Sequence, residues 1–323
     1  MHTKKILSLV SLICLGTTMV ASETPQAKES FLKRTKDKVF GFFSNYNFEQ
    51  TEDKEYAVSN PGTLTLNNFD GNITIRTNWN QNAVCVKAIK RTNKEEMLPD
   101  IRVKSAQQQV NGQDDLTIAT VYANDGVKAQ VDYELIVPSE MRLQLTTHRG
   151  MIVVNDVNGS VAASTTHGNI EINNTHQLVV AQTQKSGSIL IKDSKGPIQA
   201  TTCSGNITIK DASDNIVACA ERGTIKSMCS TVPQTGSIKL ETASGSIVLG
   251  LPTEANATIR GRTERGTVMS DHYVRLMPRE TKLNRRTWNQ FKKEIDGILG
   301  SGEANIELSC KSGNIKILET KTA

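Results

Sequence analysis

The chain has 323 residues and carries 38 basic against 33 acidic side chains, a formal net charge of +5. Hydrophobic residues make up 37% and aromatic residues only 4%, so a large core has to be built from small and branched aliphatic side chains. This near balance of charge gives no electrostatic case for a nucleic-acid partner.

The first 22 residues have the pattern of a secretory signal peptide. Lys4 and Lys5 form a basic start, residues 6–15 are apolar, and residues 20–22 supply a small-residue cleavage site. The apolar run is too short to span a bilayer. Residues 1–22 therefore predict an exported protein that is periplasmic, held at the outer cell surface or secreted.

Residues 23–55 form an N-terminal segment in which five of the seven phenylalanines stand among lysines. Leu32, Val39, Phe40 and Phe43 share one face of a helix, opposite the lysines. We expect an amphipathic, aromatic segment that caps the open end of the fold that follows. A membrane-surface helix or a partner-docking helix is the alternative.

From Tyr56 onward the sequence introduces a short unit that recurs later: Leu64, Leu66, a glycine at Gly71, then Ile73 and Ile75. The chain then departs from this unit over residues 77–137. Alternating runs joined by polar turns such as Asn111-Gly112 predict an antiparallel β-meander there. The meander is either inserted in the repeats or forms a small sheet at their N-terminal end.

Between Leu143 and Ser227 the unit repeats at spacings of 18, 19, 18 and 18 residues, counted on its glycines. Each glycine precedes one apolar alternation and follows another, which predicts strand, corner, strand, corner. One such unit cannot bury its own apolar face, so the units have to stack in parallel, like on like. The columns lie about nine residues apart, which predicts two main sheets per coil. The aligned glycines are Gly150, Gly168, Gly187, Gly205 and Gly223.

Further units follow near Ile238, Ala257 and Ile306, and residues 271–302 interrupt them. Within this interruption Trp288, Phe291, Ile295, Ile298 and Leu299 follow helical spacing. The predicted fold class is therefore all-β: a parallel β-solenoid of about 18 residues per coil over residues 56–320, with an inserted β-meander and one inserted α-helix.

Aligned acidic and amide residues stand at the second corner of each repeat: Asp156, Asn174, Asp193 and Asp211. Such side chains tolerate tight turns, so we interpret them as a turn ladder, with calcium binding as the alternative. Asp156, Asp193 and Asp211 are also the acids to test if the solenoid is a polysaccharide-active enzyme.

His148 and His167 lie one coil apart and are expected to be surface histidines; half of a metal site is the alternative. The sequence indicates no cofactor and no catalytic motif, so we expect a protein that is not an enzyme.

Five cysteines remain after the leader: Cys85, Cys203, Cys219, Cys229 and Cys310. Cys310 occupies the inward threonine position of its repeat, which favours a buried thiol. A bridge from Cys219 to Cys203 or to Cys229 is the preferred pairing, and the spacing does not choose between them.

Insertions in solenoids tend to map to the binding face, and the interruption at residues 271–302 is basic. A packed helix with a solvated basic face is the plain interpretation, and contact with an anionic surface polymer or membrane is the alternative. The ligand-contact candidates are Arg279, Lys282, Arg285, Arg286, Lys292 and Lys293.

The recurring pattern G-[SN]-I-x-[IL], as in Gly168-Asn169-Ile170, Gly205-Asn206-Ile207 and Gly313-Asn314-Ile315, resembles the bacterial "putative adhesin" domain of unknown function. The order of parts from Tyr56 to Glu319 is similar as well. The resemblance implies attachment and supplies no catalytic residues. We therefore expect a non-enzymatic module that binds or scaffolds a surface or envelope component, whether glycan, protein or anionic membrane. A polysaccharide-active enzyme and a structural envelope protein that assembles end to end are the alternatives.

Overall fold

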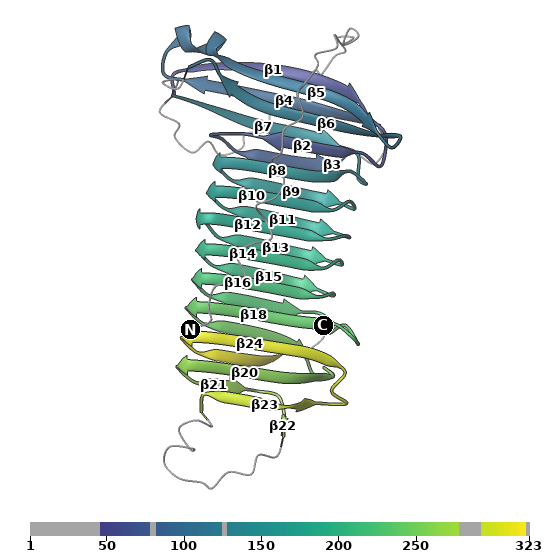
Figure 1. Ribbon diagram of the computed structural model, residues 1–323, viewed down its shortest axis with the longest axis vertical. Coiled ribbons are helices and arrows are strands. Elements are labelled where there is room, and N and C mark those ends of the chain that lie inside the picture. Colours follow the sequence, from purple (N-terminus) through teal and green to yellow (C-terminus); the bar gives the residue numbers. More distant parts are fainter. Residues whose placement is uncertain (1–45, 78–81, 125–127, 278–291, 321–323) are drawn as a thin grey trace. The chain divides into compact units, whose positions relative to one another are not determined.

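The computed structural model describes residues 46–77, 82–124, 128–277 and 292–320. These residues lie in one compact unit and form two long sheets, sheet A with 12 strands and sheet B with 13. Strands stack in parallel along most of both sheets (Figure 1). The predicted all-β solenoid is confirmed. The signal peptide and most of the N-terminal segment predicted at residues 23–55 lie outside the described residues.

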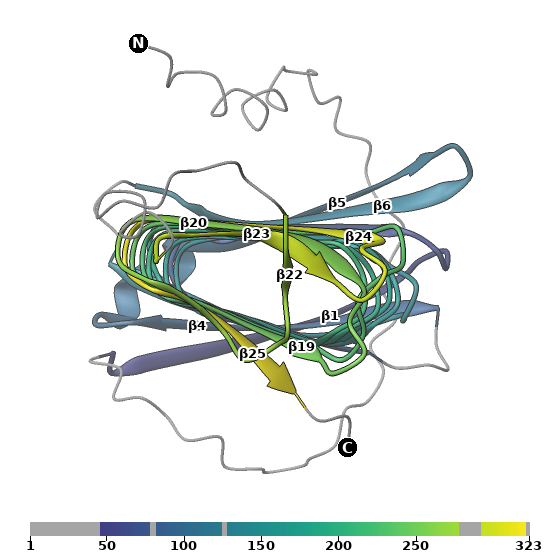
Figure 2. The ribbon, with the colours of Figure 1, turned by 90° about the horizontal axis from the view of Figure 1, so that it is seen from below.

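Six coils form a regular middle stack, and each gives one strand to each sheet. Sheet B receives β8 (Arg142–Arg149), β10 (Val161–His167), β12 (Val179–Ser186), β14 (Ile198–Ser204), β16 (Ile216–Arg222) and β18 (Ser237–Ser244). Sheet A receives β9 (Ile152–Val157), β11 (Ile170–Thr175), β13 (Ile189–Ser194), β15 (Ile207–Ala212), β17 (Ile225–Cys229) and β19 (Ile247–Pro252). The view along the stack shows the two sheets facing each other (Figure 2).

The core between the sheets consists of columns of identical side chains. Ile170, Ile189 and Ile207 are paired across sheet A, and Ala181, Ala200 and Ala218 across sheet B. All six are at most 1% exposed. Because strand side chains alternate between faces, a match of like on like fixes the register of each coil on its neighbour.

The first corner of each coil requires glycine. Gly187 has φ +147°, and a Cβ placed on it would lie 1.8 Å from the carbonyl oxygen of Gly168 in the neighbouring coil. The second position of the G-[SN]-I motif, directly after the glycine, links neighbouring coils. Its side chain accepts a hydrogen bond from the next coil, as in Ser188 N to Asn169 Oδ1 at 2.8 Å and Thr224 N to Asn206 Oδ1 at 2.9 Å.

The second corner is the predicted turn ladder. Asp156, Asn174, Asp193 and Asp211 all have φ between +52° and +61°, the left-handed region that aspartate and asparagine tolerate. Asn174 Nδ2 donates to Asp156 Oδ1 at 2.8 Å, which links two coils. Among the described residues, no group of three or more His, Cys, Asp or Glu side chains could hold a metal ion.

A column of inward threonines closes the glycine corners from inside the core. Thr183 Oγ1 donates to Thr202 Oγ1 at 2.6 Å, and Thr202 Oγ1 donates to the Gly187 carbonyl at 3.0 Å. Cys310 takes a threonine position, paired with Thr242 in the register, and its thiol donates to the Gly245 carbonyl at 3.2 Å. Cys310 is 2% exposed, as predicted for a buried thiol.

At the N-terminal end the chain order and the spatial order differ. The elements are β1 (Phe48–Ala57), β2 (Thr63–Asn67), β3 (Ile73–Thr77), β4 (Ala83–Thr92), the 3₁₀ helix η1 (Glu95–Asp100), β5 (Ile101–Val110), β6 (Gln113–Tyr122) and β7 (Ala129–Val137). Strands β2 and β3 form the predicted first coil, and β6 and β7 stack on its outer side in parallel. Strands β5, β4 and β1 then extend the two sheets in antiparallel fashion. The meander therefore lies at the N-terminal end of the stack.

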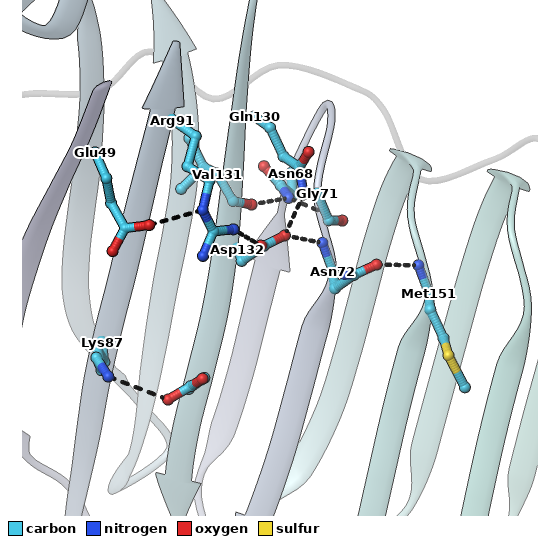
Figure 3. Close-up of polar contacts among 11 residues, drawn as sticks. Glu49, Asn68, Gly71, Asn72, Lys87, Arg91, Gln130, Val131, Asp132 and Met151 are labelled. Atoms are coloured by element: carbon cyan, nitrogen blue, oxygen red, sulfur yellow. Dashed lines mark hydrogen bonds and ion pairs between the residues drawn. The ribbon is translucent and has the colours of Figure 1, made fainter. Parts of the chain in front are cut away.

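Asp132 on β7 holds this out-of-order coil in place (Figure 3). Its carboxylate accepts hydrogen bonds from Gln130 Nε2 at 2.8 Å and from the Asn72 backbone N–H at 2.7 Å, and it pairs with Arg91 on β4. Arg91 Nε also donates to Glu49 on the edge strand β1 at 2.9 Å. One carboxylate thus connects the added strands to the first coil.

The C-terminal end also departs from chain order. Its elements are β20 (Ala257–Arg265), β21 (Val268–Ser270), β22 (Arg275–Leu276), β23 (Glu294–Leu299), β24 (Ala304–Ser312) and β25 (Ile315–Thr320). The last coil, β24 with β25, lies between β18 with β19 and β20 with β21. The last coil of the described residues therefore fills the position between two coils that precede it in the sequence.

The predicted inserted helix is wrong over its described part. Ile295, Ile298 and Leu299 belong to the strand β23, which pairs with β20 in antiparallel fashion. The helical spacing was misleading because Gly297 is a poor helix former, the two β-branched isoleucines favour a strand, and β20 offers an open edge for pairing. Trp288 and Phe291 lie outside the described residues.

The preferred disulfide is also wrong, since all five described cysteines are free. Cys219 lies on the outer face of sheet B, whereas Cys229 is buried in the core beside sheet A, so these two cannot approach each other. Cys203 lies on the same outer face as Cys219, and its thiol donates to Glu221 Oε2 at 3.0 Å.

Candidate functional site

The predicted ligand-contact residues are only partly described. Arg279, Lys282, Arg285 and Arg286 lie outside the described residues. Lys292 and Lys293 directly precede β23, and their carbonyls accept hydrogen bonds from Val268 and Thr263. Lys293 Nζ donates to the Glu264 carbonyl at 2.8 Å. These lysines therefore fasten the end of the insertion to β20 and β21, and their contact with a ligand stays a prediction.

The strand that ends this insertion forms one side of a groove on the outer face of sheet B. The groove crosses β18, β24, β20 and β23, and its floor includes Gly261 and Leu308. Its charged lining residues are Glu241, Arg260, Arg262, Glu294, Asp296 and Glu307. Residues 294–296 of the insertion, which the sequence suggested as a binding region, thus line one side of this groove.

The register of the four strands sets charges of opposite sign side by side. Arg260 is paired with Asp296 on one side and with Glu307 on the other, and Arg262 is paired with Glu294. Arg262 Nε lies 3.3 Å from Glu294 Oε1, and Arg260 Nε lies 3.9 Å from Asp296 Oδ1. The groove therefore presents an alternating lattice of guanidinium and carboxylate groups.

The arginines of the lattice face the solvent. The side chains of Arg260 and Arg262 are 61% and 74% exposed, while those of Asp296 and Glu294 are 24% and 18% exposed. Exposed ion pairs contribute little to stability because water screens them and the side chains lose entropy. Both guanidinium groups can therefore exchange these contacts for contacts with a ligand at small cost.

A second unusual surface is a run of rings at the N-terminal glycine corners. Phe69 stacks on His148 with centroids 5.0 Å apart, and His148 meets His167 edge to face at 5.9 Å. Tyr122 contacts Phe69 from the other side at 6.1 Å. His167 Nδ1 also lies 3.0 Å from Ser186 Oγ. The two histidines do meet, as the sequence suggested, but as members of an aromatic run.

Sequence reasoning missed Phe69 and Tyr122 because the coil of β6 stacks out of chain order. Phe69 is 49% exposed, and its position before a corner glycine was the available signal. Arg149 Nε and Nη2 donate to the two oxygens of Asp70 at 2.8 Å and 2.9 Å beside these rings. Burial and the nearby Asp70 carboxylate raise the pKa of Tyr122, so its hydroxyl stays neutral at physiological pH.

The three acids considered for catalysis lie in the second corner. Asp156, Asp193 and Asp211 belong to the left-handed turn ladder, where their backbone conformation already explains their residue type. Their part in an enzyme stays untested. Within the described ranges, no helix is long and apolar enough to cross a membrane.

No protein-family model matches the sequence, and no curated protein matches it. Solved structures do show a likeness. A "putative adhesin" from Bacteroides fragilis is 12% identical with a TM-score of 0.42, over 84% of this chain and 97% of that chain. One from Parabacteroides distasonis is 12% identical with a TM-score of 0.31, over 83% and 97%.

A "putative cell adhesion protein" from Clostridium sporogenes is 10% identical with a TM-score of 0.27, over 84% of this chain and 100% of that chain. These descriptions are of the kind that the G-[SN]-I resemblance named. At identities and TM-scores this low, the likenesses carry no argument about function.

Proposed function

We propose that the protein is an exported, non-enzymatic β-solenoid that binds a zwitterionic component of the cell envelope through the charged groove at its C-terminal end. The proposal takes up the attachment role that the sequence resemblance implies. The observation that carries it is the alternating lattice of Arg260, Arg262, Glu294, Asp296 and Glu307 in the groove.

The arrangement of charge selects the class of ligand. A ligand with only negative groups would meet the four carboxylates of the groove, and one with only positive groups would meet the two guanidinium groups. A ligand that carries both ammonium and carboxylate groups can place each beside its opposite. Guanidinium groups also bind carboxylates with two parallel hydrogen bonds, which adds geometric selectivity.

Titration calorimetry with soluble peptidoglycan fragments tests this proposal. Fragments with free amino and carboxyl groups should bind, and the same fragments should weaken when the amines are acetylated or the carboxyls are amidated. Binding should also fall with added salt, because the contacts are exposed. The Arg260→Gln, Arg262→Gln double variant should bind about tenfold more weakly.

The matched control is Lys192→Gln with Lys210→Gln on sheet A, which removes the same charge from another face. This control should bind like the wild type. Equal binding by the two double variants, or no binding of any fragment by the wild type, would contradict the proposal.

A further inference from the structure

The outer face of sheet B carries no charge along two neighbouring columns over seven consecutive strands, from β6 and β2 through β8 to β16. The register fixes the members of each column. The first column is Thr117, Thr65, Gln144, Ala162, Val180, Gln199 and Val217, and the second is Ala119, Asn67, Thr146, Ser164, Gln182, Thr201 and Cys219. We call these fourteen residues the neutral face.

The neutral face is not imposed by the fold. On β18, the next strand of the same sheet, the two columns continue with Lys239 and Glu241, which form an ion pair at 3.2 Å. The outer face of sheet A carries Glu171, Lys192 and Lys226 at equivalent outward positions. Charged residues make up 22% of the chain, so the absence of charge from these two columns does not follow from the overall composition.

A shallow groove crosses the neutral face near its N-terminal half. Its lining includes Arg142 together with Thr63, Gln144, Ala162, Leu178 and Val180. Ala162 is short and Leu178 is 39% exposed, so apolar surface lies open beside amide and hydroxyl groups. Phe69 and His148 continue this surface at the glycine corner, where their rings stack.

We propose that the neutral face binds an extended, uncharged polysaccharide that lies across the strands. A charged side chain facing a neutral ligand would lose water without gaining a counter-charge, so an uncharged face suits an uncharged polymer. Glutamine, threonine and serine side chains donate to and accept from hydroxyl groups. Neighbouring strands place such polar side chains about every 4.8 Å along each column. A polymer with a regular repeat can therefore make a series of weak contacts along the column.

Apolar side chains in and beside the neutral face add a second kind of contact. The C–H faces of sugar rings can cover Val180, Leu178 and the Phe69 ring, which removes apolar surface from water. Many weak contacts along one strand of polymer add up through effective concentration. The in-register rows that the parallel strands form across sheet B favour an extended, β-linked ribbon over a curved chain.

This inference deepens the proposed function, on which its biological setting rests. The neutral columns run directly into the charged groove at β18, on the same face of sheet B. A polymer with an uncharged sugar backbone and zwitterionic side groups would contact the neutral face with its backbone and the groove with its side groups.

Calorimetry of the full chain with chitohexaose tests the inference, with maltohexaose as the curved control. The wild type should bind chitohexaose saturably and maltohexaose much more weakly. The Gln199→Lys, Thr201→Glu double variant reproduces on β14 the pair that Lys239 and Glu241 form on β18, so the fold tolerates it. It should bind chitohexaose about tenfold more weakly.

Two controls separate this inference from the proposed function. Thr208→Glu places the same kind of ion pair with Lys210 on sheet A and should leave binding unchanged. Arg260→Gln with Arg262→Gln should keep chitohexaose binding even though it weakens fragment binding. If the wild type binds chitohexaose but none of the peptidoglycan fragments, that result would count against the groove only.

Equal binding of chitohexaose by the wild type and the Gln199→Lys, Thr201→Glu variant would overturn the inference. Failure of the wild type to bind any neutral β-linked hexasaccharide would do the same. A wild-type dimer in sedimentation velocity that this variant abolishes would instead assign the neutral face to a second copy of the chain, and would also overturn it.

Discussion

The glycine corners and the neutral face belong to the same coils, yet opposite rules govern them. From Gly150 to Gly245, six corner glycines have φ between +143° and +153°, and each touches the backbone of its neighbour. In the two columns of the neutral face on the same coils, residue type varies among uncharged residues until β18, where Lys239 and Glu241 enter. Close backbone approach and burial therefore specify the fold, while the outer positions are free to specify binding.

The largest expected effect comes from breaking a corner. Gly187→Ala should lower the free energy of unfolding by more than about 3 kcal/mol, because its Cβ would meet the Gly168 carbonyl oxygen at 1.8 Å in a left-handed backbone. Urea denaturation measures this. The control is Gly112→Ala, which has φ +78° but no neighbour within 4 Å and should cost about 1–2 kcal/mol. Equal costs would show that close approach is unimportant.

The threonine column is the next test. Thr183→Val should cost about 1 kcal/mol, because it removes the buried hydrogen bond between the Thr183 and Thr202 hydroxyls while Thr202 keeps its bond to the Gly187 carbonyl. Thr201→Val, on the outer face of the adjacent coil, should change stability by less than about 0.5 kcal/mol. Thermal unfolding followed by circular dichroism compares the two. A larger effect for the outer threonine would refute the division between inner and outer positions.

A smaller effect is expected at the second corner. Asp193 has φ +53°, so Asp193→Ala should cost about 1 kcal/mol and Asp193→Gly should cost little or nothing. Chemical denaturation of both variants gives the comparison. If alanine were as stable as glycine here, the turn ladder would owe its aspartates to something other than backbone conformation.

The smallest perturbation is chemical labelling of the cysteines, which distinguishes outward from inward positions without changing the sequence. Burial raises the pKa of Cys229 to about 11, so its thiol is protonated and shielded at pH 8. Cys203 and Cys219 on the outer face should react with iodoacetamide first, and Cys229 and Cys310 only on unfolding. Mass spectrometry of timed samples identifies the order. Early labelling of Cys229 would contradict the assignment of its face.

Sequence reasoning recovered the features that are local or periodic. The spacing of the glycines fixed the coil length, and the alternation of Ile189 with Ile191 identified an inward face. The order of the coils at both ends escaped it for a physical reason. Ile238 can stack equally well on Ile259 or on Ile306, because all three present the same column, and only long-range packing places Ile306 next to it.

The candidate site was less predictable than the core. The sequence pointed to residues 271–302, but the lattice of charge arises only when β23 pairs with β20 and sets Arg262 beside Glu294. The neutral face shows a similar limit. Its members on β8 to β16 could be taken from the repeat, whereas Thr117 and Ala119 join it only through the out-of-order stacking of β6 on β2.

The most direct test is the affinity of zwitterionic peptidoglycan fragments for the Arg260→Gln, Arg262→Gln variant, measured beside its melting temperature. We expect about tenfold weaker binding with an unchanged melting temperature, because both guanidinium groups face the solvent and water screens their ion pairs. Unchanged affinity, or a loss of affinity that follows a lower melting temperature, would contradict the claim that the outer face of sheet B carries recognition independently of the fold.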